Sequence, residues 1–172
     1  TNRLRIVGVP RDGEMPIVDG TSRVGDNDDE VFDITASDVS LRKLDVRNGY
    51  GIDCTGARCA FERLEMHMSD QSGDCVEIDG AQGRVERSEF LGCDDNNVDI
   101  EGNRGKVLGN FMRSGDNGCL EIDGDKAVVH RNSIRNCEDG EAVDFNGNGS
   151  VFTNNVARSA DNQIFRIDGD AN

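Results

Sequence analysis

Two carboxylates recur around a single apolar residue at a near-constant interval along the chain. The sequence reads VEIDG at 76–80, VDIEG at 98–102 and LEIDG at 120–124. The acids alternate with apolar residues, a pattern that places both acids on the polar side of a β-strand. Stacked copies would bring carboxylates of neighbouring copies to about 5 Å from each other. The candidate metal ligands are therefore Glu77, Asp79, Asp99, Glu101, Glu121 and Asp123.

A stacked row of carboxylates is chemically suited to a hard cation such as Ca²⁺, which takes about six to eight oxygen ligands. Carboxylates about 5 Å apart repel each other by roughly 1 kcal/mol in water and by roughly 3 kcal/mol at an effective dielectric constant of about 20. Screening salt, bound cations or neighbouring arginines must offset this repulsion. Three interpretations stay open at this point: a Ca²⁺ site, a solvated, partly salt-bridged face, and direct catalysis by the carboxylates.

Further charged residues flank the acidic strands. The polar stretches before these strands contain further acids, among them Asp94, Asp95 and Asp116. Eleven positions past the glycine of two repeats lie Arg113 and Arg135, part of a basic column that we expect to pair with the loop acids. Together with His130, one of only two histidines, these arginines are candidate substrate-binding residues. Two histidines are too few for a multi-histidine metal site.

The acidic strands belong to a repeat of about 22 residues. Its central apolar position is occupied by Ile34, Cys54, Ile78, Ile100, Ile122, Phe145 and Ile167, at intervals of 20 to 24 residues. LRIVG at 4–8 fits an earlier copy centred on Ile6, which predicts eight coils. Two further apolar columns, for example at Val107 and Met112, predict three short strands in each repeat. The pattern predicts an all-β solenoid with three short parallel sheets, formed by residues 1–172 as one domain.

Asparagines recur at the bend between two of these strands, at Asn110, Asn132 and Asn155. Together with the VxIxG strands, this ladder resembles the right-handed parallel β-helix superfamily, which includes pectate lyases and polygalacturonases. The resemblance implies a right-handed β-helix and calcium-binding acids on the acidic strands, with the ion bridging an acidic sugar polymer. The stretch GCDDNNVDIEG at 92–102 is similar to a strand entry of polygalacturonases, which implies paired catalytic acids among Asp94, Asp95 and Asp116.

The charge of the chain limits its partners. There are 34 acids and 19 lysines and arginines, which gives a net charge of −15. Nucleic acid is not expected as a partner, because it needs a basic footprint. No run of about 18 apolar residues occurs, so membrane insertion is not expected. Together with the polysaccharide ligand that the resemblance implies, these features favour an extracellular or cell-surface location.

The six cysteines do not match a disulfide framework by column. Cys75 and Cys119 share one column position two coils apart, and so do Cys93 and Cys137. Two coils correspond to roughly 9.6 Å, beyond the ~7 Å that a disulfide can span between Cα atoms. We therefore expect small apolar fillers of the interior, with Cys54 and Cys59 as the one pair compatible with a bond.

The sequence favours a carbohydrate-binding or carbohydrate-active domain that acts on an extracellular polysaccharide with Ca²⁺ as cofactor. An enzyme of this kind would be a polysaccharide lyase or a glycoside hydrolase. The alternative is a non-enzymatic scaffold such as an adhesin or spike segment, because the loops are short and regular except for an insertion at 21–30. We also expect either a fragment of a longer protein or an end-to-end homo-oligomer, since no capping element is evident at either end.

Overall fold

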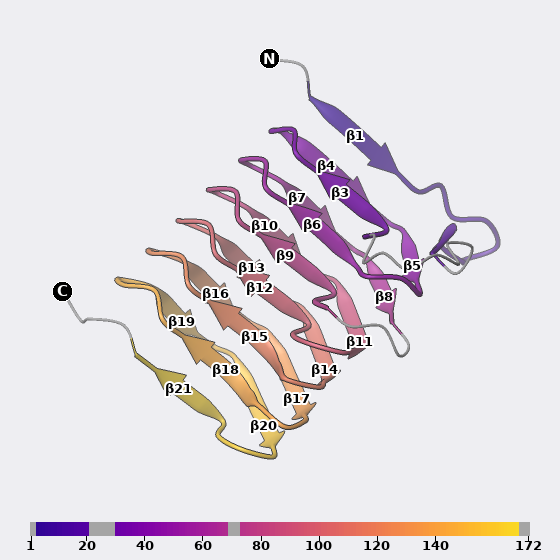
Figure 1. Cartoon of the computed structure of the whole chain (residues 1–172). Helices are drawn as coiled ribbons and strands as arrows, with labels where there is room; N and C mark the ends of the chain where they lie inside the picture. The colour runs from indigo at the N-terminus through magenta and orange to yellow at the C-terminus, as the bar shows by residue number, and fades with distance from the viewer. Residues whose placement is uncertain (1–2, 21–29, 69–72, 169–172) are drawn as a thin grey trace.

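The protein is a β-solenoid of about six turns, seen in a computed structural model that describes residues 3–20, 30–68 and 73–168. The described residues form 21 strands and no helix, and the strands stack in parallel into three seven-stranded sheets. Figure 1 shows the coils succeeding one another from the indigo N-terminal end to the yellow C-terminal end. The predicted all-β solenoid with three parallel sheets is confirmed.

Each coil contributes one strand to each sheet. The first sheet contains β1 (Leu4–Val7), β4 (Val39–Arg42), β7 (Ala60–Glu62), β10 (Arg84–Glu86), β13 (Lys106–Leu108), β16 (Val128–His130) and β19 (Val151–Thr153). The second sheet contains β2 (Ile17–Asp19), β5 (Asp45–Arg47), β8 (Glu65–His67), β11 (Glu89–Cys93), β14 (Phe111–Gly115), β17 (Ser133–Cys137) and β20 (Val156–Ala160). The third sheet contains β3 (Phe32–Ile34), β6 (Ile52–Cys54), β9 (Val76–Ile78), β12 (Val98–Ile100), β15 (Gly118–Ile122), β18 (Glu141–Phe145) and β21 (Phe165–Ile167).

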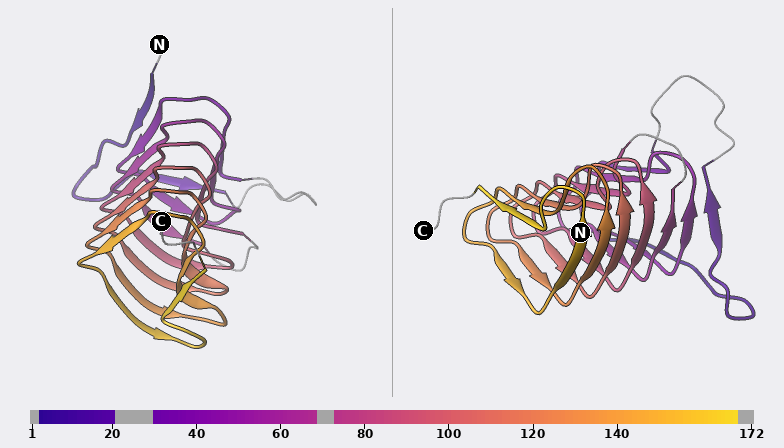
Figure 2. Two further views of the ribbon diagram at one scale, coloured as in Figure 1. Left: turned by 90° about the vertical axis from the view of Figure 1, so that its left-hand side faces the viewer. Right: turned by 90° about the horizontal axis from the view of Figure 1, so that it is seen from below.

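The apolar columns read from the sequence line the interior. In the third sheet Ile100 pairs in register with Ile78 on one side and Ile122 on the other, and all three are fully buried. Val107 of the first sheet and Met112 of the second are also fully buried. Figure 2 shows the resulting row of coils of similar outline. The core is therefore one continuous apolar column, closed by three sheets whose polar sides face outward.

The expected number of eight coils is wrong, because LRIVG at 4–8 belongs to another sheet. Ile6 lies on β1 and pairs with Leu41 of β4 in the first sheet, not with Ile34 of the third. An alternating apolar pattern ending in glycine fits strands of more than one sheet, and only the long-range pairing distinguishes them. The expected insertion at 21–30 falls almost wholly on residues outside the described part of the chain.

The asparagine ladder forms as the resemblance implies. Asn132 donates from Nδ2 to the carbonyl oxygen of Val107 at 2.8 Å, and its Oδ1 accepts from the backbone N–H of Asn110 at 2.9 Å. The amide of Asn110 makes the equivalent bonds one coil earlier, to Val85 and Ser88. Because Asn110 and Asn132 are buried, these bonds satisfy backbone groups that water cannot reach.

The glycine that ends each acidic strand is required by close stacking of the coils. A Cβ atom on Gly102 would lie 2.3 Å from the carbonyl oxygen of Gly80, and one on Gly124 would lie 2.3 Å from that of Gly102. The left-handed conformation of this turn falls instead two residues later, on Gln82 (φ 64°) and Arg104 (φ 63°). The glycine column therefore sets the contact distance between coils rather than the sign of φ.

The cysteines are not apolar fillers: all six form disulfides, between Cys54 and Cys59, Cys75 and Cys93, and Cys119 and Cys137. The expected Cys54–Cys59 pair is confirmed. The other two bonds join cysteines of different columns. Each bond links a cysteine at the start of a third-sheet strand to the cysteine at the end of the next second-sheet strand along the chain. Their Cα atoms are 5.5 and 5.6 Å apart, within reach of a disulfide, whereas cysteines of the same column remain two coils apart.

Candidate functional site

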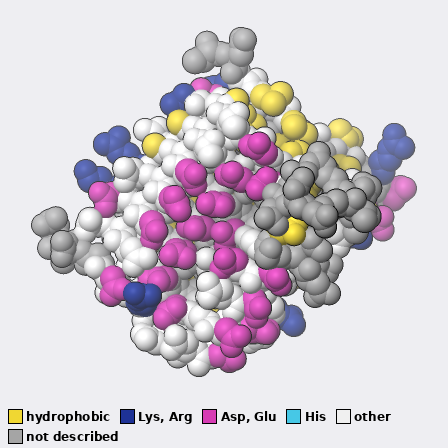
Figure 3. Space-filling view, in the orientation of Figure 1, with side chains coloured by type: hydrophobic (Ala, Val, Ile, Leu, Met, Phe, Trp, Pro, Cys, Tyr) yellow, Lys and Arg dark blue, Asp and Glu magenta, His cyan; other side chains and the backbone are white. Residues whose placement is uncertain are grey.

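The polar side of the third sheet carries the two predicted columns of carboxylates, which we call the acidic face. The first column is Asp33, Asp53, Glu77, Asp99, Glu121 and Asp144, each in register with the next. The second column, two residues further along each strand, includes Asp79, Glu101 and Asp123. In Figure 3 the magenta side chains gather over this sheet. Because the strands pair in parallel and in register, acids at equivalent positions of successive repeats become neighbours in a row.

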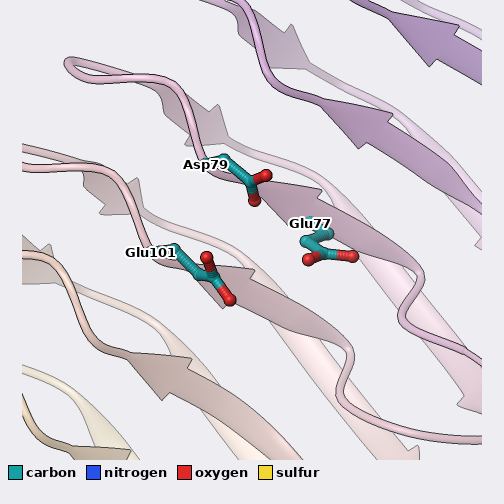
Figure 4. A group of neighbouring side chains, drawn as sticks. All are labelled: Glu77, Asp79 and Glu101. Atoms are coloured by element: carbon teal, nitrogen blue, oxygen red, sulfur yellow. The ribbon is translucent and has the colours of Figure 1, made fainter.

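Three of the predicted metal ligands converge between β9 and β12. Glu77, Asp79 and Glu101 each offer a carboxylate oxygen, and these oxygens all lie within 4.8 Å of one another. Figure 4 shows the three side chains on the outer side of the two strands, with Asp79 and Glu101 on successive coils. Asp79 and Glu101 are exposed and Glu77 is partly buried, so the group is accessible from solvent. Such a group of oxygens can hold a hard cation.

Asp99 lies beside this group, on β12 two residues before Glu101 and in register with Glu77. Its side chain is only 9% exposed, and its buried Oδ1 atom has no hydrogen-bond partner among the described residues. Burial and, to a lesser extent, the neighbouring carboxylates of Asp74 and Glu121 together raise the pKa of Asp99 to about 9. A carboxylate in this position needs either a proton or a cation to offset its desolvation.

Other carboxylates of the first acidic column also have raised pKa values. Burial raises the pKa of Glu77 to about 7, with contributions from Asp79 and Asp53. Burial also raises the pKa values of Asp53, Glu121 and Asp144. The Oδ1 atoms of Asp53 and Asp144 are, like that of Asp99, buried and without a hydrogen-bond partner in the described part of the chain. The column is therefore built with oxygen lone pairs that the protein itself does not satisfy.

A shallow pocket of about 370 Å³ opens next to β9, and sequence reasoning missed part of it. It is lined by Glu30, Tyr50, Ile52, Asp53, Gly73, Asp74, Glu77 and Asp95. Burial and, second, the negative charge of Asp95 raise the pKa of Asp74 to about 7. The 2.7 Å hydrogen bond that Asp74 accepts from the backbone N–H of Asn96 lowers the pKa but does not offset these two causes. In the sequence, Asp74 could have been recognised by its position directly before Cys75, at the start of an acidic strand.

Among the described residues, arginines compensate the acidic face only at its C-terminal end. Arg166 lies 3.4 Å from Asp144 and 2.7 Å from Asp168. Across residues 3–20, 30–68 and 73–168, no other lysine or arginine forms an ion pair with the acidic face. Within those same ranges Arg113 and Arg135 form no ion pair either, so their expected pairing with the loop acids is not found. Arg135 instead donates to Ser133 and lies over the ring of Phe111.

The candidate catalytic carboxylates do not gather in one pocket. Asp95 lines the pocket beside Glu77 and accepts a 2.9 Å hydrogen bond from Asn117. Asp94 and Asp116 are exposed and do not line this pocket. The paired acids implied by the resemblance to polygalacturonases therefore remain a prediction that this arrangement does not favour.

The three candidate substrate-binding residues lie on two different sheets. Arg113 and Arg135 are exposed neighbours in register on β14 and β17 of the second sheet. His130 lies on β16 of the first sheet, where its Nδ1 atom is 2.8 Å from the hydroxyl oxygen of Thr153. The two arginines can contact one ligand, but His130 belongs to a separate surface.

Comparison of the chain with protein-family models, curated proteins and solved structures finds no match. The described residues include no helix that is long and apolar enough to cross a membrane. The three disulfides are typical of proteins from oxidising compartments such as the extracellular space.

Proposed function

We propose that this protein is an extracellular or cell-surface β-helix domain that binds Ca²⁺ on its acidic face and, through the bound ion, an acidic polysaccharide. The observation that carries the proposal is the convergence of Glu77, Asp79 and Glu101 beside the buried, unpartnered carboxylate of Asp99. Ca²⁺ would be held by the three converging side chains, with Asp99 supplying negative charge from below.

A divalent cation resolves the electrostatic problem of the acidic face. Each neighbouring pair of carboxylates in a column is separated by about one strand spacing of 4.8 Å and repels its neighbour. Arginine compensation is confined to Asp144 and Asp168 within the described residues. A Ca²⁺ ion between β9 and β12 would offset this repulsion among Glu77, Asp79 and Glu101 and would leave coordination positions for oxygen ligands from outside the protein.

Acidic polysaccharide is the ligand class that such an ion selects. A uronate chain offers carboxylate and hydroxyl oxygens at a repeat length comparable with the spacing between coils. The acidic face alone would repel that chain, so binding there depends on the ion. The acidic side chains that gather in the middle of Figure 3 form an open surface, as a linear polymer requires.

Calcium binding is tested by calorimetric unfolding. Millimolar Ca²⁺ should raise the melting temperature, while sodium at matched ionic strength should do less, because screening supplies no ligand cage. Glu77→Gln combined with Glu101→Gln should remove the calcium-specific part of the shift. Asp33→Asn, an exposed member of the same column outside the cluster, is the matched control and should respond like the parent. Equal effects of calcium and sodium would leave the acidic face as a solvated surface.

A non-enzymatic scaffold, such as an adhesin or spike segment, is the second candidate. The observation that favours it is the dispersal of the catalytic candidates, with Asp94 and Asp116 exposed outside the pocket that Asp95 lines. Apolar side chains such as Val9 and Ile167 are also exposed near the two ends of the described coils, which suits an end-to-end contact between copies. Polygalacturonate incubated with the protein and Ca²⁺ separates the candidates: shortened or unsaturated products indicate an enzyme.

A further inference from the structure

The first sheet has the opposite charge from the rest of the molecule. Twelve of the chain's 19 lysines and arginines, but only four of its 34 acids, lie on this sheet and its two flanking bends. The residues concerned are those at 3–7, 37–43, 57–63, 81–87, 103–109 and 125–131. A protein with a net charge of −15 therefore concentrates positive charge on one of its three faces.

A groove of about 570 Å³ runs over this face. Its floor follows one column of register partners, in which Arg5 on β1 precedes Ser40 on β4, Ala60 on β7 and Arg84 on β10. Lys106 on β13 continues the column. Because Ser40 and Ala60 are short, the surface is hollow between the long basic side chains at either end. Arg5 and Arg84 are three strand spacings apart, or about 14 Å.

The bends before β7 and β13 add two further cations to one rim of the groove. Arg58 and Arg104 occupy this bend in a left-handed conformation, with φ of 62° and 63°, and both are exposed. The repeat keeps this conformation in every coil from Asp38 to Lys126, so the side chains leave the backbone in the same direction. Gln82 occupies the same position in the coil between them, so Arg58 and Arg104 stand two coils apart on the rim.

Several of these cations are not neutralised within the protein. Arg58 donates two hydrogen bonds to Asp38, both of 2.8 Å, and Arg84 lies 3.3 Å from Glu86. In contrast, Arg5, Arg104 and Lys106 form no ion pair with any residue in the described part of the chain. They line one groove and remain available to an external anion.

We propose that this groove, which we call the basic groove, is a calcium-independent binding site for a linear anionic glycan that carries carboxylates or sulfates. The chain would lie across β1, β4, β7, β10 and β13, with its sugar rings over Ser40 and Ala60. Its anionic groups would meet Arg5, Arg84 and Lys106 along the floor and Arg104 at the rim. The site is separate from the acidic face and does not rely on its ion.

The groove fits a glycan better than a nucleic acid. Arg84 and Lys106 are one strand spacing apart, which is comparable with the length of one pyranose ring. Single-stranded nucleic acid is held by aromatic side chains on which bases stack. The outward residues of these strands provide none, since Phe61 is buried in the interior. A phosphate backbone with its denser charge would also meet the repulsion of a molecule that is acidic elsewhere.

The test measures binding in EDTA, where the calcium site cannot contribute. The probes are polygalacturonate for carboxylates, dextran sulfate for sulfates, uncharged dextran, and a single-stranded DNA oligomer, all titrated by calorimetry at low ionic strength. We expect at least one of the two anionic glycans to bind, and uncharged dextran not to bind. Arg84→Ser with Lys106→Ser should lower the affinity about tenfold. Arg11→Ser with Arg158→Ser, two exposed arginines elsewhere, makes the same change in net charge and should lower it less than about twofold.

A charge-neutral variant separates the groove from general electrostatic attraction. Ala60→Gln fills the hollow floor, so it should weaken binding without changing the net charge. Absence of glycan binding in EDTA, equal losses in the two double variants, or full affinity in Ala60→Gln would each overturn the proposal, as would tighter binding of DNA. Glycan binding that appears only with Ca²⁺, and is lost in Glu77→Gln with Glu101→Gln, would overturn the basic groove alone and leave the proposed function standing.

Discussion

Replacing Asp99 by asparagine should stabilise the protein when no divalent cation is present, and the gain should grow as the pH rises. In the folded state the pKa of Asp99 is about 9, because burial and neighbouring acids disfavour its charge. In the unfolded chain an aspartate has a pKa of about 3.9. Between these values the folded protein holds a proton that the unfolded chain has released, so the free energy of unfolding falls with rising pH.

The size of the effect follows from this linkage. One proton contributes about 1.4 kcal/mol per pH unit, so Asp99 alone lowers the free energy of unfolding by about 3 kcal/mol between about pH 5 and about pH 7. Asparagine does not titrate and has nearly the same shape. The difference in stability between Asp99→Asn and the parent should therefore widen by the same amount over that range. Calcium at about 100 times its Kd should raise the free energy of unfolding of the parent by about 3 kcal/mol and that of the variant by less.

Urea unfolding in EDTA across this pH range measures the difference directly. Asp33→Asn is the control, because Asp33 stands in the same column but is exposed, and its substitution should change stability by less than about 0.5 kcal/mol at every pH. Parallel curves for Asp99→Asn and the parent would refute the reasoning. Such a result would mean that Asp99 reaches water or a partner in solution, and that the acidic face needs no cation.

Three further predictions concern the scaffold. Asn132→Ala should cost about 1–3 kcal/mol in urea unfolding, because the carbonyl of Val107 loses a buried donor; an unchanged midpoint would reduce the ladder to polar turn residues. Gly80→Ala should cost more than about 2 kcal/mol, since its Cβ would lie 2.0 Å from a backbone oxygen of the preceding coil, and a neutral result would contradict that stacking distance. Cys119→Ala with Cys137→Ala should lower the stability by about 3 kcal/mol, and an unaffected variant would argue against the bond.

The register of the solenoid was predictable because a parallel stack of equal repeats turns sequence spacing into spatial neighbourhood. The 22-residue interval placed Ile100 between Ile78 and Ile122 and Asn132 between its ladder neighbours. The same reasoning assigned Ile6 to the wrong sheet. Its strand precedes the regular repeat, so no interval related it to a sheet, and only the hydrogen bonds between β1 and β4 assigned it.

The sequence by itself therefore determined which residues face inward, which acids share a column, and which amides form the ladder, since these depend only on alternation and period. The tertiary structure alone decided how deeply each acid is buried, why Asp99 is enclosed while Glu101 two residues later is exposed, and which cysteines meet. It also decided that cations from separate bends and strands line one groove. These properties depend on the path of the loops and on the size of side chains in adjacent coils, which no single repeat contains.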